Sequence, residues 1–473
     1  MQNKISVYEY GAEQRDYCMK INNLYKSLYK TRTPKAFVKT YGCQQNVSDS
    51  EKYIGMLLEM GFEMVFDQNE ADVVLFNTCA IRENAENKTF GNLGWIKSIK
   101  KANPNLFVIL CGCMTEQESV IKKIKNTYNF VDLVFGTHSI HRFPELLYKS
   151  LTEKNEKGKN LCVKENIDSI LENAPIKRDS SVKAFLSIMY GCNNFCSYCI
   201  VPYVRGRERS REPKEILKEF ENLLKAGYKD ITLLGQNVNS YCKDLDIGYD
   251  FADLLRDVNN IDGKFRIRFM TSHPKDATQK LFDTIAECDK VCKHVHLPFQ
   301  SGSDRVLSLM NRRYTAEKYL SLVKYAKEKI PDVSFTSDVI VGFPTETEED
   351  FTETLELIKE VGFSGLYTFL FSPRPGTPAA TMDGQISPDI KSERFNRLLA
   401  LQNENSVKAN EKYIGKTVEV LVEGYPDGDR ENMTGRTEDN TIVRFPAKDG
   451  ITGEFVSVKI DKALNWAVFG RII

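Results

Sequence analysis

The pattern of apolar and polar residues divides the chain into stretches of different periodicity. Between residues 34 and 150, short apolar runs alternate with amphipathic stretches of helical spacing such as SDSEKYIGMLLEMG. We interpret the runs as buried parallel strands, and they are residues 36–43, 72–79, 106–113 and 130–136. Strands that alternate with helices in this way predict an open parallel α/β domain at residues 34–150.

A second series of alternating strands and helices covers residues 181–410. Residues 151–180 before it are polar with few large apolar side chains, which predicts a linker. Six β/α units in this second series are fewer than the eight of a complete barrel, so we predict an incomplete (β/α)6 barrel. Its expected strands are residues 184–190, 230–236, 264–271, 293–300, 333–342 and 365–372.

A long charged helix is expected near residues 391–415. The pattern changes again toward its end, in the region 411–473. Polar and apolar residues there alternate with period two, and Gly, Asp and Asn interrupt them. This predicts a small antiparallel β-barrel. Residues 1–33 precede the first domain as an N-terminal extension. The expected fold class is therefore α/β, with an open parallel domain, an incomplete barrel and a small β-barrel.

Composition narrows the possible classes of protein. Hydrophobic residues make up 41% of the 473 and charged residues 27%, which is typical of globular domains. No apolar run approaches the roughly 20 residues that span a bilayer, and the N-terminus lacks the apolar core of a signal peptide. We therefore expect a cytoplasmic protein without a membrane partner. Net charge is zero, so a nucleic acid would be bound by a local patch.

The spacing of three cysteines is the strongest local signal. Cys192, Cys196 and Cys199 form a Cys-x3-Cys-x2-Cys pattern directly after the first barrel strand. Active sites of such barrels lie at this carboxyl end of the strands. Three thiolates can hold a [4Fe–4S] cluster and leave one iron open to a chelating small molecule. The alternatives are chance spacing or a zinc site, but zinc favours a fourth ligand and none lies nearby.

Three further cysteines each follow a predicted strand of the first domain. They are Cys43 in TYGCQQN, Cys79 in FNTCA and Cys113 in CGCM. Because the carboxyl ends of parallel strands share one edge of a sheet, these thiols are expected to converge on one metal site. The alternative is that they are buried structural thiols.

The cysteine pattern in the barrel resembles that of the radical S-adenosylmethionine (SAM) superfamily. With the scattered N-terminal cysteines and the C-terminal barrel, which resembles a TRAM domain of the OB kind, the whole chain looks like a methylthiotransferase. TYGCQQN, LLGQNVNSY and HLPFQSGSDRVLSLMNRRYT resemble the branch that modifies isopentenylated adenosine in tRNA. The resemblance implies two [4Fe–4S] clusters, SAM, a tRNA substrate and an electron-donating protein, and we expect a monomer.

The chemistry of that family agrees with the residues. The C2–H bond of a purine is too weakly acidic for a general base near neutral pH, whereas a cofactor radical can remove its hydrogen. By resemblance, SAM is held by loops at the ends of the barrel strands, although turn formation alone also explains their residues. The candidates are Gly235, Gln236, Asn237, Ser301, Gly302, Ser303, Asp338 and Gly342. The catalytic side chains that contact the target base are not identified.

RNA contacts are expected from the segment RGRERSR, which follows the cysteine loop. In an extended segment its period-two arginines would project to one side, toward phosphates or bases; the alternative is a solvated loop. These arginines are Arg205, Arg207, Arg209 and Arg211. In the C-terminal barrel Phe445 and Trp466 are candidates for stacking or for core packing.

The resemblance therefore implies an enzyme that adds a methylthio group to C2 of N6-isopentenyladenosine at position 37 of tRNA. One alternative is the same chemistry on threonylcarbamoyladenosine in tRNA or on a ribosomal-protein aspartate. A second alternative, from another class, is a non-catalytic iron–sulfur protein that binds RNA.

Overall fold

The computed structural model describes residues 6–153, 161–163 and 169–473. Within them the chain forms two compact units. The first contains the described residues up to Asp179 together with Tyr190–Asn193 and Cys199–Arg209. The second contains Ser180–Met189, Asn194–Tyr198 and Ser210–Ile473. The chain therefore passes repeatedly from one unit to the other between residues 180 and 210.

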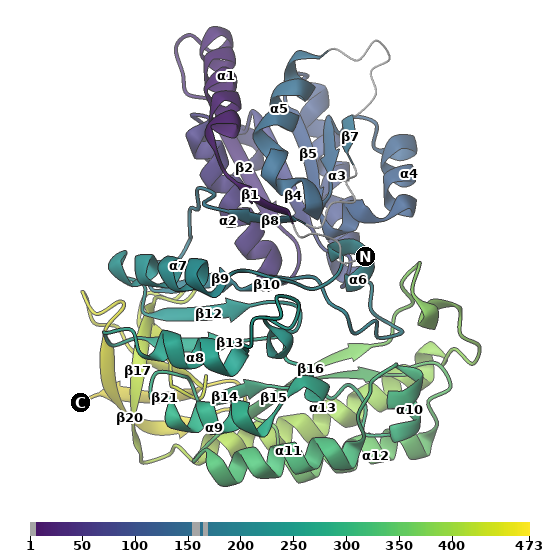
Figure 1. The fold of residues 1–473 in the computed structure, drawn as a ribbon, viewed down its shortest axis with the longest axis vertical. Coiled ribbons are helices and arrows are strands. Elements are labelled where there is room, and N and C mark those ends of the chain that lie inside the picture. The colour runs from purple at the N-terminus through teal and green to yellow at the C-terminus, as the bar shows by residue number, and fades with distance from the viewer. Residues whose placement is uncertain (1–5, 154–160, 164–168) are drawn as a thin grey trace. The chain divides into compact units, whose positions relative to one another are not determined.

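A six-stranded parallel sheet lies at the centre of the first unit (Figure 1). Its strands, in spatial order, are β3 (Glu63–Met64), β2 (Lys35–Thr40), β4 (Val73–Thr78), β5 (Phe107–Gly112), β6 (Leu133–Phe135) and β7 (Leu161–Val163). Four of them, β2, β4, β5 and β6, lie where the apolar runs predict strands. The accompanying helices are α2 (Gln44–Glu59), α3 (Glu83–Ala102), α4 (Glu118–Thr127) and α5 (Phe143–Thr152).

The two faces of this sheet belong to two separate hydrophobic cores. Val73 and Leu75 of β4 pack in the core that contains side chains of α2 and α5, whereas Val74 and Phe76 pack with α3 and α4. Helices cover both faces of the sheet, so side chains on both sides of each strand are buried. This is why the strands are continuous apolar runs in which polar and apolar residues do not alternate. The predicted open α/β domain is confirmed.

Residues predicted as an extension and a linker contribute regular elements to the first unit. β1 (Ser6–Glu9) pairs in parallel with β8 (Ser169–Glu172), and α1 (Ala12–Leu28) buries Cys18, Ile21 and Tyr25. The remaining linker residues 154–160 and 164–168 lie outside the described residues. Such short strands escape detection because four residues carry little periodicity and their pairing partners are distant in the chain.

The second unit contains a six-stranded open barrel, as predicted. Its strands are β9 (Lys183–Ser187), β12 (Asp230–Leu234), β13 (Arg266–Phe269), β14 (His294–His296), β15 (Ser334–Val341) and β16 (Gly365–Leu370). They form two three-stranded parallel sheets, β9-β12-β13 and β14-β15-β16. A bridge between Ile267 and Val291 joins the third strand to the segment that leads into the fourth.

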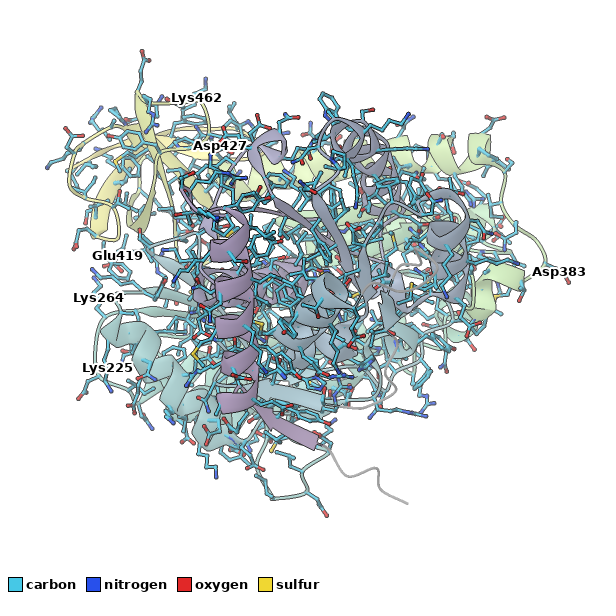
Figure 2. All side chains as sticks on the ribbon, turned by 90° about the horizontal axis from the view of Figure 1, so that it is seen from above. Lys225, Lys264, Asp383, Glu419, Asp427 and Lys462 are labelled. Carbon is cyan, nitrogen blue, oxygen red and sulfur yellow. The ribbon has the colours of Figure 1, made fainter. Side chains whose placement is uncertain are left out.

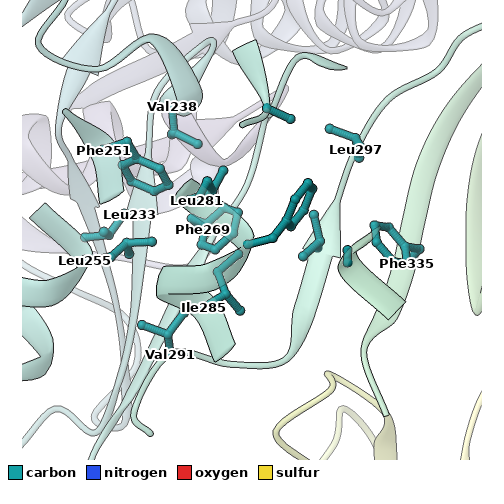
Figure 3. Packing of buried hydrophobic residues seen from close by; sticks show 14 of the residues in the cluster. Leu233, Val238, Phe251, Leu255, Phe269, Leu281, Ile285, Val291, Leu297 and Phe335 are labelled. Carbon is teal, nitrogen blue, oxygen red and sulfur yellow. The ribbon is translucent and has the colours of Figure 1, made fainter. Parts of the chain in front are cut away.

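Helices around this barrel bury its apolar core (Figure 3). Leu233 and Phe269 from the strands pack with Phe251 and Leu255 of α8 and with Leu281 of α9. The helices are α7 (Pro213–Lys225), α8 (Phe251–Asn259), α9 (Gln279–Glu287), α10 (Asp304–Leu309), α11 (Ala316–Lys329), α12 (Glu348–Val361) and α13 (Pro388–Glu411). This packed layer holds the loops at the strand ends.

The chain ends in a small closed barrel. Its strands, in spatial order, are β17 (Thr417–Gly424), β18 (Asn432–Arg436), β19 (Ile442–Pro446), β21 (Val468–Ile472) and β20 (Phe455–Ala463). The pair of β19 and β21 is parallel and the other pairs are antiparallel. An all-antiparallel barrel is impossible with five strands, because directions cannot alternate around a closed ring with an odd number of members.

Side chains of β13 hold this small barrel against the (β/α)6 barrel. Buried Arg268 pairs with Asp230 at 2.9 Å and donates to the carbonyls of Thr437 and Glu438 at 2.9 and 3.1 Å. An exposed ion pair between Lys264 and Glu419, which lie side by side in Figure 2, joins the same two barrels.

No helix in the described part of the chain is both long and apolar enough to cross a membrane.

Candidate functional site

The loops after β2, β4 and β5 carry the first set of cysteines. Cys43 is the N-cap residue of α2, Cys79 directly follows β4, and Cys113 directly follows β5. The three strands are parallel neighbours, with Thr40 paired to Asn77 and Thr78 paired to Gly112. The cysteines therefore lie at one edge of the sheet, where the ends of these strands meet.

Two glycines allow the backbone to approach closely at this edge. Gly42 has a φ of +146°, and a Cβ atom there would lie 2.7 Å from the Cβ of Cys79. Gly112 has a φ of +99°, and a Cβ atom there would lie 2.4 Å from Oδ1 of Asn77. A larger residue at either position would force the cysteine loops apart.

Buried amides fix the loop that carries Cys43. Its thiol donates to Oδ1 of Asn46 at 3.3 Å. Nδ2 of Asn46 in turn donates to the carbonyl of Thr78 at 2.9 Å, and Nδ2 of Asn77 donates to the carbonyl of Asn46 at 2.8 Å. The first turn of α2 is thus held to the end of β4. Asn46 and Asn77 were not among the predicted site residues, although both lie within the cysteine motifs TYGCQQN and FNTCA.

The other two sulfurs of this set accept hydrogen bonds. The sulfur of Cys79 accepts from the backbone N–H of Ile81 at 3.3 Å, and the sulfur of Cys113 accepts from Nε of Arg205 at 3.1 Å. Nη2 of the same arginine donates to Oδ2 of Asp49 at 2.9 Å. Donors that point at sulfur are typical of the surroundings of thiolate-bound metals.

Burial controls the protonation of these thiols. It raises the pKa of Cys79, and neighbouring Cys43 raises it further. Burial also raises the pKa of the Cys113 thiol to about 12, although Arg205 acts in the opposite direction. Both thiols are therefore protonated near neutral pH in the metal-free protein. Binding of a metal would release their protons.

The donor set fits an iron–sulfur cluster chemically. Three soft sulfur donors follow neighbouring strands at this edge, and the sulfurs of buried Cys79 and Cys113 accept hydrogen bonds as metal-bound thiolates do. In the described residues, no three Cys, His, Asp or Glu side chains already surround a common point at which they would hold a metal ion. The fit therefore depends on the type and placement of the donors.

The second set of cysteines lies in the loop between β10 (Met189–Tyr190) and α6 (Val201–Arg205). In this set Cys196 is buried, and its sulfur lies 3.6 Å from Nη1 of Arg312. Nη2 of Arg312 donates to the carbonyl of Pro298 at 2.6 Å, which fixes the guanidinium. Arg312 is 116 residues from Cys196 in the chain, so no local sequence pattern predicts it as a neighbour of the cysteine loop.

Unpaired buried polar atoms gather at the ends of β12 and β13. In the described structure, Oδ1 of Asn237, both amide atoms of Asn239, Oγ of Ser272 and Nε2 of His273 have no hydrogen-bond partner. All four side chains are buried. A buried polar atom without a hydrogen-bond partner destabilises the folded protein. These atoms would gain partners from a bound polar ligand such as SAM. Only Asn237 among the four was a predicted SAM contact.

The other predicted SAM-binding residues differ in their surroundings. Ser303 donates to Asp350 at 2.6 Å, and the N–H of Gly302 donates to Thr354 at 2.9 Å, so both are bound to α12. The N–H of Gly342 donates to Glu346 at 3.0 Å. The remaining positions are Gly235 and Gln236 after β12, Ser301 after β14 and Asp338 within β15.

Three of the four predicted RNA-binding arginines are buried. Arg205 contacts Cys113 and Asp49, Arg209 donates to backbone carbonyls, and Arg211 pairs with Glu219 at 2.9 Å. The segment is not extended throughout, because α6 ends at Arg205 and a two-residue strand begins at Arg209. The shared exposed side expected from period-two spacing is therefore absent in the described structure. Arg207 is exposed.

Two histidines of the (β/α)6 barrel and the two aromatic candidates of the C-terminal barrel lie in different surroundings. His294 and His296 both hydrogen-bond to Thr336 inside the barrel, and burial lowers the pKa of each ring. Phe445 packs in the core of the C-terminal barrel. Trp466 is 49% exposed. Its ring contacts the guanidinium of Arg444 and the ring of Phe469, and of the two aromatic candidates it is the more exposed.

Comparison with known families gives three matches along the chain. The profile of the "uncharacterized protein family UPF0004" matches residues 35–136, that of the "radical SAM superfamily" residues 186–358, and that of the "TRAM domain" residues 411–473.

Whole-length relatives decide the family. A tRNA-2-methylthio-N(6)-dimethylallyladenosine synthase of Clostridium perfringens is 52% identical over 96% of this chain and 99% of the relative. The synthase of the same name from Acetivibrio thermocellus is 50% identical over 98% of this chain and 96% of the relative. The chain belongs to this synthase family. It is therefore a radical-SAM enzyme, and membership implies a [4Fe–4S] cluster, SAM and a tRNA substrate.

Solved structures share the fold of this synthase family at low sequence identity. The radical SAM methyltransferase TsrM from Kitasatospora setae matches with a TM-score of 0.54 and 15% identity, over 74% of this chain and 75% of that chain. The cobalamin-dependent radical enzyme OxsB matches with a TM-score of 0.51 and 13% identity, over 71% of this chain and 52% of that chain.

Proposed function

We propose that this chain adds a methylthio group to C2 of N6-isopentenyladenosine at position 37 of tRNA. The observation that carries the proposal is the identity of at least 50% to synthases of that name over nearly the full length of both chains. The two cysteine sets support it, because the reaction replaces a C–H bond that general bases do not break.

We propose that Cys192, Cys196 and Cys199 hold the SAM-binding cluster and that Cys43, Cys79 and Cys113 hold a second [4Fe–4S] cluster. When bound, the clusters and SAM would supply the one-electron chemistry and the methyl group, and the second cluster would take part in delivery of the sulfur or methylthio group. The protein residues position these groups and exclude water. Hydrogen-bond donors at the buried sulfurs of Cys79, Cys113 and Cys196 support both assignments.

Loops at the barrel strand ends are proposed to hold SAM. The unpaired atoms of Asn237, Asn239, Ser272 and His273 would bind its polar groups. Nδ1 of His273 accepts from the backbone N–H of Lys275. Its Nε2 is therefore the protonated nitrogen of the neutral ring, so it offers a hydrogen-bond donor to a carboxylate or hydroxyl. The other predicted contacts in these loops remain part of the proposal.

The remaining partners follow from this function. We propose that residues 34–150, 181–410 and 411–473 act as three domains, with Arg207 and Trp466 as RNA contacts. A protein that donates electrons one at a time would reduce the cluster. We also propose that the enzyme is monomeric and works in the cytoplasm, where its tRNA substrate is found.

Mass spectrometry of tRNA nucleosides tests the proposal. The reduced, iron-loaded protein is incubated with SAM and either isopentenylated or unmodified tRNA. Methylthiolation of the isopentenylated tRNA alone is expected. Product on threonylcarbamoylated tRNA or on the ribosomal protein would assign another branch of the family. Absence of both 5′-deoxyadenosine and methylthiolated product would instead indicate a non-catalytic iron–sulfur protein that binds RNA.

A further inference from the structure

Arg205 was predicted to contact RNA, but it is buried beside Cys113, one of the three candidate ligands Cys43, Cys79 and Cys113. It is 5% exposed and ends α6, which begins two residues after Cys199. Its Nε donates to the sulfur of Cys113 at 3.1 Å, and its Nη2 donates to Oδ2 of Asp49 at 2.9 Å. The guanidinium therefore bridges one carboxylate and one candidate cluster ligand.

Other contacts hold α6 in place without help from the guanidinium. The hydroxyl of Thr137 donates to the carbonyl of Val204 at 2.8 Å, and Arg209 donates to the carbonyl of Arg205 at 2.9 Å. Ile200 and Val204 pack with Cys113 in a small apolar cluster. The side chain of Arg205 is thus directed at the sulfur by a backbone that is anchored independently.

The charges of Arg205, Asp49 and the Cys113 sulfur suggest a function for the guanidinium. A buried cation is stable only where negative charge compensates it, and Asp49 provides one negative charge. Cys113 provides a second only when its sulfur is a thiolate, as in a metal ligand. A cationic donor to a ligand sulfur stabilises the more negative, reduced form of an iron–sulfur cluster and so raises its reduction potential.

We propose that Arg205 is a positioning residue for the second cluster, where it fixes the Cys113 sulfur and raises the reduction potential of the cluster. This inference rests on the proposed assignment of Cys43, Cys79 and Cys113 to that cluster. It also explains why a basic residue beside the cysteine loop is withdrawn from solvent. Asp49, the other partner of the guanidinium, carries a negative charge and therefore lowers the reduction potential.

The test uses full-length protein in which Cys192, Cys196 and Cys199 are all alanine, so that only the second cluster remains. Iron per chain is measured after reconstitution, and the potential is measured by redox titration followed by electron paramagnetic resonance. Arg205→Gln should keep the iron and shift the potential to more negative values. Asp49→Asn removes a negative charge and should shift it to more positive values.

Controls separate this function from a merely structural one. Arg142→Gln removes another arginine–carboxylate pair of the same unit, which is more exposed, with Glu145 at 2.7 Å, and should leave the potential unchanged. Arg205→Lys keeps the positive charge, so its reduction potential should lie between those of the parent and Arg205→Gln. If the glutamine variant does not fold, the potential of the lysine variant tests the proposal. An unchanged potential in iron-loaded Arg205 variants would overturn the proposal. A parent background without iron would instead overturn the second cluster itself.

Discussion

At the scale of single residues, a buried arginine beside the sulfur distinguishes two candidate ligand cysteines from a cysteine that fills a core. Cys113 and Cys196 each lie against a buried arginine, whereas Cys288 belongs to the apolar core of the (β/α)6 barrel. A cationic donor at sulfur is useful where the sulfur carries negative charge. This supports a metal-binding function for both cysteine sets.

Replacement of Cys196 by alanine should abolish the production of 5′-deoxyadenosine from SAM. Two protein sulfurs then remain at the SAM-binding cluster, and Arg312 loses its sulfur neighbour. Chromatography of reactions without tRNA measures the product. Cys288→Ala, a buried cysteine outside both sets, serves as the control and should retain activity. SAM cleavage by the Cys196 variant at the parent rate would refute the ligand assignment.

Replacement of Arg207 by glutamine should weaken tRNA binding and reduce the slope of log K against log salt by about one unit. Arg207 is chosen because its neighbours Arg205 and Arg209 are buried. Binding is measured over a range of salt concentrations. Lys225→Gln, at an exposed lysine on α7 (Figure 2), should leave both values unchanged. Equal slopes in the Arg207 variant and the parent would show that the segment is only a charged loop.

The arginine segment also shows where sequence patterns stop being informative. Period-two spacing predicts a common side only if the backbone is extended, and α6 breaks that condition. The inward direction of Arg205 depends on Asp49 and Cys113, which come from distant parts of the chain. No local pattern reports such partners, because arginine is usually exposed.

At the scale of elements, β13 connects the two barrels of the second unit. Its period-two residues Arg266 and Arg268 are both buried and donate to carbonyls of the C-terminal barrel. The sequence predicted the strand but not this contact, since charged residues in a strand normally indicate a solvated face. The C-terminal barrel is therefore attached by buried hydrogen bonds as well as by surface charges.

Replacement of Arg268 by methionine should destabilise the protein by about 3–5 kcal/mol, because Asp230 would remain buried without its partner. Replacement of Lys264 by methionine should cost at most about 1 kcal/mol, since its pair with Glu419 is exposed. Denaturant unfolding of both variants measures the difference. Equal effects would show that the buried pair contributes no more than a surface ion pair does.

At the scale of the whole molecule, the fold class and the family could be predicted from the sequence. Long apolar runs such as residues 106–113 and the spacing of Cys192, Cys196 and Cys199 are local signals that survive without tertiary information. Elements such as β1 and β8 could not be predicted, because each is short and is stabilised by its distant partner. The same limit applies to the unpaired polar atoms of Asn239 and Ser272, which only burial makes significant.

Replacement of Cys43, Cys79 and Cys113 by alanine should abolish methylthiolation and leave SAM cleavage intact. The reconstituted parent should carry roughly eight irons per chain as two four-iron clusters. The variant with alanine at positions 43, 79 and 113 should keep about half of them and still form 5′-deoxyadenosine, because the other cysteine loop is intact. It should make no methylthiolated nucleoside, since the proposed second cluster, which would take part in sulfur delivery, would be lost.

Cys111→Ala is the matched control for that experiment. Cys111 is buried on β5, two residues before Cys113, and it contacts the apolar core that faces α2 and α5 instead of the cysteine edge. Its loss should cost stability but leave the full iron content and the methylthiolated product. If the triple variant keeps all of its iron, or if it still methylthiolates tRNA, then Cys43, Cys79 and Cys113 are core residues and the site at the sheet edge has been misassigned.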